Sequence, residues 1–163
     1  MSILQTIDLK KYYGTEPNIT KALDGVNFSV EEGEFVAVVG TSGSGKSTML
    51  HMMGGLDTPT SGRVIVRGEE LAKKNDEELT IFRRRNIGFI FQNYNLVPIL
   101  NVYENIELPL LYMGISASER KKRVETAMER MAITHRSKHF PQQLSGGQQQ
   151  RVAIARAVVA NPK

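Results

Sequence analysis

The sequence lacks cysteine and tryptophan among its 163 residues, and aromatic residues make up only 7% of it. Without cysteine, the chain forms no disulfide, holds no zinc through thiolates and has no cysteine nucleophile. Long apolar runs are also missing: the stretch at 35–39 has five residues, against the roughly 20 that a membrane-spanning helix needs. The first residues, MSILQTIDLKK, place charge after the apolar patch, the reverse of a secretory signal. We therefore expect a soluble protein that is not exported.

Charge of one sign is not in large excess either. Lys and Arg number 21 against 17 Asp and Glu, a formal net charge of +4, which is too small to indicate nucleic acid binding by itself. Apolar residues (40%) and charged residues (23%) are close to the averages of globular domains. The composition therefore predicts one folded domain rather than a disordered chain.

The apolar pattern predicts an α/β fold. Strands are expected at 3–9, 26–30 and 64–66, and the continuous apolar runs at 35–39 and 87–91 predict strands buried on both faces of a sheet. Helices are expected over 46–53, 76–85, from 116 to about 131 and from 145 to about 160. Capping boxes begin the last two, Ser116 with Glu119 and Ser145 with Gln148. The segment 96–113 is apolar but broken by Pro98 and Pro109, and no element is assigned to it.

Residues 40–48 read GTSGSGKST and match the phosphate-loop pattern G-x-x-x-x-G-K-[ST]. The match follows a predicted strand and precedes a predicted helix. Backbone N–H groups surround a phosphate where no Cβ obstructs them, and the helix dipole points its positive end at the same place. We expect Lys46 to reach the β- and γ-phosphates, Ser47 to bind Mg²⁺ and Thr48 to contact the α-phosphate. The rest of the predicted cradle is Gly40, Ser42, Gly43, Ser44 and Gly45.

A second glycine-containing helix start reads LSGGQQQR at 144–151. Capping alone accounts for Ser145 and Gln148, and many helices begin in this way. Gly146 and Gly147, however, each lower helix propensity by about 1 kcal/mol, a cost that capping does not require. Because free N–H groups at a helix N-terminus attract anions, the chain has two candidate phosphate contacts.

With these two motifs in this order, the chain resembles an ATP-binding subunit of ABC transporters over essentially its whole length. GTSGSGKST resembles the Walker A loop and LSGGQ the signature motif of that family. The resemblance implies a P-loop α/β domain with antiparallel strands at its N-terminus, a small helical subdomain, and ATP and Mg²⁺ as ligands. It also implies a head-to-tail dimer, in which Ser145, Gly146, Gly147 and Gln148 cap the nucleotide held by the second subunit.

Two further positions match the family. Gln92 resembles the Q-loop glutamine that contacts Mg²⁺ and the attacking water. The resemblance therefore implies that Lys46 and Gln92 are catalytic and that Ser47 and Gln92 are metal ligands. The alternative for Gln92 is an exposed loop residue without a role. Tyr13, within KYYG, resembles the aromatic residue that stacks on adenine. Stacking accepts any ring face, so Tyr12 remains an alternative.

The family pattern continues beyond Lys163, into a Walker B strand ending in Asp-Glu and a later histidine. None of Asp8, Asp24, Asp57 and Asp76 follows the required apolar strand. We therefore expect 1–163 to be a single incomplete domain, divided into a nucleotide-binding core (1–95), a helical subdomain (96–139) and the signature with its helix (140–163). Such a chain is expected to bind MgATP but to hydrolyse it poorly, because the carboxylate that positions water is missing.

The implied function is to couple ATP binding and hydrolysis to transport through a membrane permease, at the inner face of the cell membrane. The stretch FRRRNIGFIFQNYNLVPILNVYENIELPL resembles exporters of the macrolide-export, lipoprotein-release and peptide-antibiotic-resistance type. One alternative is a soluble ABC-type ATPase acting on nucleic acid or ribosomes, which would favour long inserted coiled coils; another is a nucleotide-binding module without motor activity. No nucleic acid partner is expected. The basic run Arg83, Arg84 and Arg85 is either a solvated face or, with 93–113, a contact for the permease.

Overall fold

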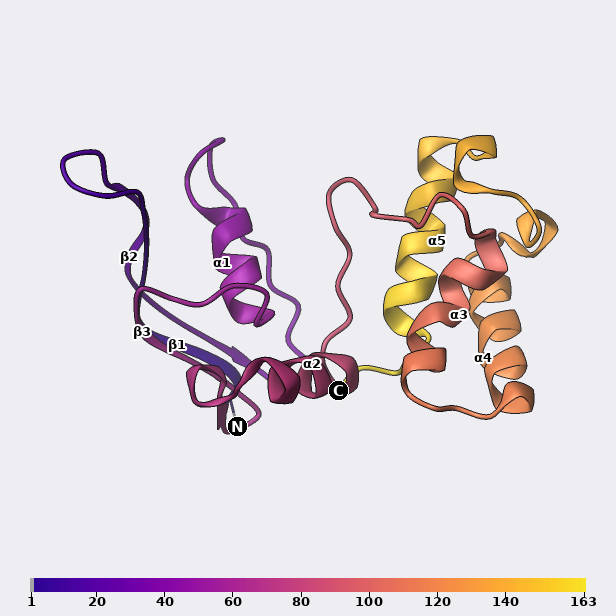
Figure 1. Ribbon diagram of the computed structural model, residues 1–163, viewed down its shortest axis with the longest axis horizontal. Helices are drawn as coiled ribbons and strands as arrows, with labels where there is room; N and C mark the ends of the chain where they lie inside the picture. Colours follow the sequence, from indigo (N-terminus) through magenta and orange to yellow (C-terminus); the bar gives the residue numbers. More distant parts are fainter. Residues whose placement is uncertain (1) are drawn as a thin grey trace. The chain divides into compact units, whose positions relative to one another are not determined.

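The computed structural model describes residues 2–163 and divides into two compact units, 1–80 and 81–163. Each unit has its own arrangement of elements, which Figure 1 colours along the sequence. No helix within residues 2–163 is long and apolar enough to cross a bilayer.

The first unit is an antiparallel sheet with one helix against it. The strands β1 (Ser2–Tyr13), β2 (Thr20–Glu31), β3 (Ser61–Val66) and β4 (Glu69–Glu70) lie in the order β2-β1-β3-β4. Helix α1 (Lys46–Met53) contacts β1, β2 and β3, and buries Met49, Met52 and Met53. A short 3₁₀ turn, η1 (Leu71–Lys73), follows β4. The strands predicted at 3–9, 26–30 and 64–66 are confirmed, as is the helix over 46–53.

Three helices build the core of the second unit, after α2 (Asp76–Asn86) at the boundary between the units: α3 (Val102–Tyr112), α4 (Ala117–Arg130) and α5 (Gly146–Val158). The 3₁₀ turns η2 (Thr134–Arg136) and η3 (Pro141–Gln143) connect α4 to α5. Fully buried apolar side chains join the three helices, among them Ile106 and Leu110 of α3, Val124 of α4 and Val152 of α5. Burial of these apolar faces is the main stabilising contribution to the unit.

Helix α3 was missed by the sequence analysis. Its start carries a complete capping box, in which the Asn101 side chain accepts from the Glu104 backbone N–H and the Glu104 carboxylate accepts from the Asn101 N–H. Pro109 lies in the last turns of α3, where it removes one helical hydrogen bond without ending the helix. The Asn-x-x-Glu spacing at 101–104 was the signal that could have predicted this helix.

The predicted capping box at Ser116 is wrong, although α4 begins where it was expected. Ser116 makes no side-chain capping bond. Glu119 instead accepts a hydrogen bond from Nε of Arg123 at 2.7 Å, one turn along the helix. An ion pair at this spacing is charge-assisted, and it draws the carboxylate away from the helix terminus.

The strands predicted at 35–39 and 87–91 are also absent from the structure. Both segments lie outside any strand or helix, and Phe35 is 96% and Val39 is 87% exposed. A strand inside a parallel sheet forms only where neighbouring strands pair with its backbone groups. The sheet formed by residues 2–163 contains β1 to β4 alone. The two apolar runs therefore have the composition of buried strands, but no strand within residues 2–163 pairs with them.

Candidate nucleotide-binding site

The phosphate loop folds around the side chain of Lys46. The Nζ atom of Lys46 donates to the carbonyl oxygens of Gly40 at 2.7 Å and Thr41 at 2.6 Å, and to Oγ of Ser44 at 3.2 Å. The ammonium group is therefore within hydrogen-bonding distance of the start and the middle of the loop. A cation held there, at the N-terminus of α1, is placed to meet phosphate oxygens.

Two glycines of the loop allow close contacts that a side chain would prevent. A Cβ atom on Gly45 would lie 2.4 Å from the carbonyl oxygen of Ala22, and one on Gly40 would lie 2.6 Å from Oγ of Ser44. Gly43 and Gly45 also have positive φ angles, 80° and 90°, which favour glycine. Ser42 and Ser47 are exposed, and Thr48 is half-buried. These features fit a loop whose backbone N–H groups bind the phosphates of a nucleotide and whose exposed Ser47 hydroxyl can reach the accompanying Mg²⁺.

The contact between Gly45 and Ala22 places the phosphate loop on the part of the β1–β2 hairpin that carries the two tyrosines. Ala22 lies between Lys21, which pairs with Tyr12, and Leu23, which pairs with Lys11. Tyr13 pairs with Thr20, at the next position of the hairpin. The structure therefore brings together, within one unit, the predicted phosphate contacts and both candidates for adenine stacking.

The two tyrosines have different partners. The Tyr12 hydroxyl donates to Asp24, which raises the pKa of Tyr12 and lowers the pKa of the Asp24 carboxyl. Tyr13 is 44% exposed, and its hydroxyl donates to Oδ2 of Asp57 at 3.2 Å. An exposed ring held by its hydroxyl is suited to stacking against a flat base.

The signature segment begins α5 with the predicted capping box, which the structure confirms. The Gln148 N–H donates to Oγ of Ser145 at 3.2 Å, and the Ser145 N–H donates to Oε1 of Gln148 at 3.0 Å. Gly146 and Gly147 are exposed, and a Cβ atom on either would meet nothing within 4 Å. Packing within residues 2–163 therefore does not require glycine at these two positions.

Gln92 is exposed in a turn, and the residues after it are attached to the signature helix. Tyr94 and Asn95 have left-handed backbone angles, with φ of 61° and 47°. Their carbonyl oxygens accept hydrogen bonds from the guanidinium of Arg156 in α5, at 2.6 and 2.7 Å. Burial lowers the pKa of Arg156. Sequence reasoning missed this arginine, because its partners are 61 and 62 residues away along the chain.

The candidate residues are divided between the two units. Tyr12, Tyr13 and the loop at 40–48 belong to the first unit, and Gln92 and the signature residues 145–148 belong to the second. Within the first unit the phosphate loop lies on the tyrosine hairpin, and within the second the Gln92 loop is bonded to α5. No group of three His, Asp or Glu side chains within residues 2–163 could hold a metal ion.

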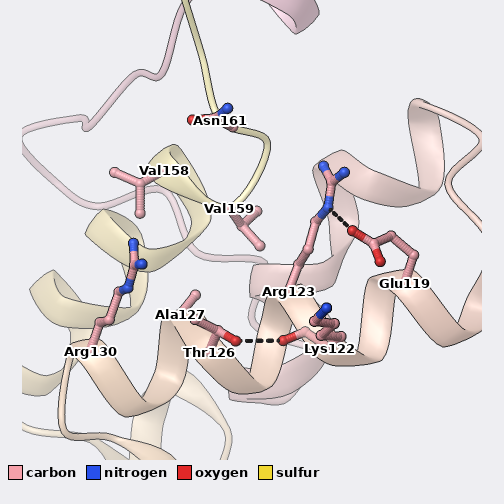
Figure 2. Close-up of a pocket in the computed structure, with 9 residues that line it drawn as sticks. All are labelled: Glu119, Lys122, Arg123, Thr126, Ala127, Arg130, Val158, Val159 and Asn161. Carbon is pink, nitrogen blue, oxygen red and sulfur yellow. Dashed lines mark hydrogen bonds and ion pairs between the residues drawn. The ribbon is translucent and has the colours of Figure 1, made fainter.

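A separate cavity of about 310 Å³ lies in the second unit, between α4 and the end of α5 (Figure 2). Its lining includes the cations Lys122, Arg123 and Arg130 and the apolar side chains of Ala127, Val158 and Val159. Arg123 is paired with Glu119 there. The cavity contains none of the residues predicted to bind nucleotide.

A glycine-framed loop that encloses a lysine ammonium and leads into a helix defines the chain as a P-loop nucleotide-binding protein. The family model described as "ABC transporter" matches residues 23–163. The chain belongs to the ABC transporter family.

Several ABC transporter proteins are similar to this chain over almost its whole length. The chain is 49% identical over 160 residues to an uncharacterized ABC transporter ATP-binding protein of Thermotoga maritima, covering 98% of this chain and 68% of that protein. It is 46% identical to the lipoprotein-releasing system ATP-binding protein LolD of Geobacter metallireducens, covering 99% and 72%. It is 45% identical to the macrolide export ATP-binding/permease protein MacB of Hyphomonas neptunium, of which it spans only 24%.

Solved structures agree with the predicted fold class. The dimeric structure of MJ0796, described as a bacterial ABC transporter cassette, matches with a TM-score of 0.93 at 45% identity, covering 98% of this chain and 70% of that one. A dimeric post-hydrolysis state of MJ0796 bound to ADP and Pi matches with a TM-score of 0.92. The predicted α/β cassette with an antiparallel N-terminal sheet is thus confirmed.

Proposed function

We propose that this ABC ATP-binding subunit binds MgATP on its phosphate loop and, with a membrane permease, couples ATP binding and hydrolysis to export. The observation that carries the proposal is the position of the Lys46 ammonium, held by three oxygen atoms of the glycine-rich loop at the start of α1. Relatives named for macrolide export and lipoprotein release support the class of transport. The chain would then act at the inner face of the membrane, through its permease.

The residues take separate roles in this proposal. Lys46 contacts the β- and γ-phosphates, Ser47 holds the Mg²⁺ of the substrate, and Tyr13 stacks on adenine. Thr48 and the loop glycines hold the remaining phosphate oxygens. Gln92, in the second unit, orients the attacking water.

Binding of MgATP tests the proposal directly. Lys46→Ala is expected to weaken binding roughly 10- to 100-fold, because a charge-assisted hydrogen bond contributes about 1.5–3 kcal/mol. Titration calorimetry of the 163-residue chain measures the affinity, with the exposed Lys138→Ala as control. Equal affinity of the Lys46→Ala chain and the unchanged chain would refute the proposed site.

We also propose that this chain hydrolyses ATP slowly. Three of its four aspartates are engaged with other partners: Asp8 with Lys10, Asp24 with Tyr12 and Asp57 with Lys11. The fourth, Asp76, lies in the first turn of α2. Without a Walker B carboxylate to orient water, the reaction lacks a contribution that is large in such enzymes. Phosphate release at the rate of a full-length relative such as LolD would contradict this part of the proposal.

The two signature glycines support a second ATP-binding subunit as partner. Nothing within residues 2–163 approaches the positions of their missing Cβ atoms, although each glycine lowers helix stability. Glycine is useful there if a ligand or another chain approaches the helix closely, as in the proposed head-to-tail dimer. The dimeric structures of MJ0796 support dimerisation of such cassettes.

Gly147→Ala is expected to change stability and dimerisation in opposite directions. The alanine should stabilise the folded chain by about 0.5–1 kcal/mol, since it favours the helix. It should also weaken ATP-dependent dimerisation about tenfold or more, because overpacking a close contact costs about 1–3 kcal/mol. Thermal unfolding and sedimentation with MgATP measure the two effects, with the exposed Gln150→Ala in the same helix as control. Unchanged dimerisation of the Gly147→Ala chain would argue against the dimer contact.

A single surface of the second unit is proposed for the permease. Nη1 of Arg84 in α2 donates to the carbonyl oxygen of Tyr112 in α3 at 2.7 Å, and the guanidinium lies 5.9 Å from the Tyr112 ring centroid. The basic run is thereby joined to the segment 93–113, where Ile99 and Tyr112 are exposed. Apolar and cationic side chains together suit an amphipathic helix as partner. A permease that still binds a chain carrying Arg83→Glu and Arg85→Glu would argue against this surface.

A further inference from the structure

We propose that Asp57 and Lys11 form a positioning pair that holds the Tyr13 ring in place for adenine stacking. The pair is separate from the residues that contact phosphate. The inference rests on the proposed function, because it assumes that ATP binds at the phosphate loop.

One carboxylate bridges the lysine and the tyrosine. Oδ1 of Asp57 lies 3.0 Å from Nζ of Lys11, and Oδ2 accepts from the Tyr13 hydroxyl at 3.2 Å. The Lys11 ammonium also lies 5.1 Å from the centroid of the Tyr13 ring. The ring is thus held at two points, its hydroxyl and its face, by two side chains that are bonded to each other.

The pair is anchored to the backbone of the segment that follows α1. Nζ of Lys11 donates to the carbonyl oxygen of Thr58 at 2.7 Å, and the Thr58 N–H donates to Oδ1 of Asp57 at 2.7 Å. The Lys11 side chain is only 14% exposed. Partial burial by itself raises the pKa of Asp57, but the hydrogen bonds from Lys11 and the Thr58 N–H outweigh it and leave the pKa below its usual value. The carboxylate therefore stays ionised and accepts from both partners at neutral pH.

This anchoring connects the base contact to the phosphate contact. Helix α1 begins with Lys46 at the phosphate loop, and Asp57 follows its end by four residues. The position of the Tyr13 ring is therefore fixed relative to α1, whose N-terminus is proposed to bind the phosphates. A bound nucleotide spans both contacts, so their separation matters for affinity.

The Tyr12 side chain, in contrast, contacts two side chains of the hairpin itself. Its hydroxyl partner Asp24 belongs to β2 and has a side chain that is 51% exposed. Lys21, which lies 5.2 Å from the Tyr12 ring centroid, also belongs to β2. The geometry thus favours Tyr13 over Tyr12 as the ring that is held for a ligand.

Comparing MgATP with magnesium tripolyphosphate isolates the base contact, because tripolyphosphate has the phosphates without the base. Asp57→Asn is expected to weaken MgATP binding roughly three- to tenfold, since the ring must then be ordered during binding, and to leave tripolyphosphate binding unchanged. Lys11→Met, which keeps an apolar stem of similar length, should change both affinities in the same way. The matched control Asp24→Asn makes the same substitution beside Tyr12 and should alter neither affinity.

Titration calorimetry of the 163-residue chain distinguishes the outcomes. If Asp57→Asn weakens ATP and tripolyphosphate equally, the pair supports the phosphate loop and the inference is overturned. If Asp24→Asn alone weakens ATP, Tyr12 is the stacking residue and the inference is again wrong. If the unchanged chain binds tripolyphosphate but ATP no more tightly, the stacking contact fails while the phosphate site stands. If it binds neither, the proposed function itself fails.

Discussion

Gly45→Ala is expected to weaken MgATP binding by about 100-fold or more, because the added methyl group disrupts the phosphate loop. Gly45 has a φ of 90°, and its Cβ would lie 2.4 Å from the carbonyl oxygen of Ala22. Ala22 belongs to β2, which is hydrogen-bonded to β1 and has little freedom to move aside. The left-handed conformation costs about 1–2 kcal/mol for alanine, and overpacking adds about 1–3 kcal/mol.

Gly43→Ala separates the effect of backbone strain from the effect of the collision with Ala22. Gly43 also has a positive φ, 80°, but a Cβ atom there would meet nothing within 4 Å. This variant carries the backbone strain without the collision, so its loss of affinity should be clearly smaller. Titration calorimetry and urea unfolding of both variants measure the difference. Equal losses would show that strain alone is responsible and that the contact with Ala22 is unimportant.

Asn105→Leu should destabilise the second unit by about 2–4 kcal/mol, since each buried hydrogen bond contributes about 0.5–1.5 kcal/mol. Asn105 is fully buried, and its Oδ1 accepts from the Val97 N–H at 2.8 Å. Its Nδ2 donates to the carbonyl oxygens of Val97, Leu100 and Asn101, at 3.1, 2.9 and 3.0 Å. Leucine fills a similar volume but leaves these backbone groups without their side-chain partner.

Urea unfolding measures this effect, with Asn86→Leu as the matched control. Asn86 donates from Nδ2 to a single carbonyl oxygen, that of Phe82, at 2.9 Å. Its replacement should therefore cost about 1 kcal/mol, about half of the larger effect or less. A loss for Asn105→Leu no greater than for Asn86→Leu would mean that the segment before α3 does not depend on the buried amide.

Local sequence patterns predicted those parts of the fold that depend on neighbours in sequence. The helix over 46–53 and the capping box of Ser145 and Gln148 were predicted correctly, because hydrogen bonds within a few residues determine them. The segment 35–39 was predicted wrongly, since a strand depends on pairing with another part of the chain. Helix α3 was missed because Pro98 and Pro109 indicated a broken segment and the capping box at Asn101 was not recognised.

In the candidate site, too, residues in a local motif were predicted and residues that depend on distant contacts were not. The phosphate loop was recognisable because its function requires glycines and a lysine at fixed spacing. Arg156 and Asp57 were not recognisable, since Arg156 meets the Gln92 loop 61 residues away and Asp57 meets Lys11 46 residues away. Spacing along the chain carries no information about such contacts until the fold brings them together.

The fold of Lys46 over its own loop has a kinetic consequence. Its three hydrogen bonds, to Gly40, Thr41 and Ser44, hold the loop in a closed turn. An incoming triphosphate then exchanges the hydrogen bonds of one side chain for contacts with phosphate oxygens, rather than ordering the whole segment. Association should accordingly be limited by diffusion and charge attraction, and differences in affinity among nucleotides should appear mainly in their rates of release.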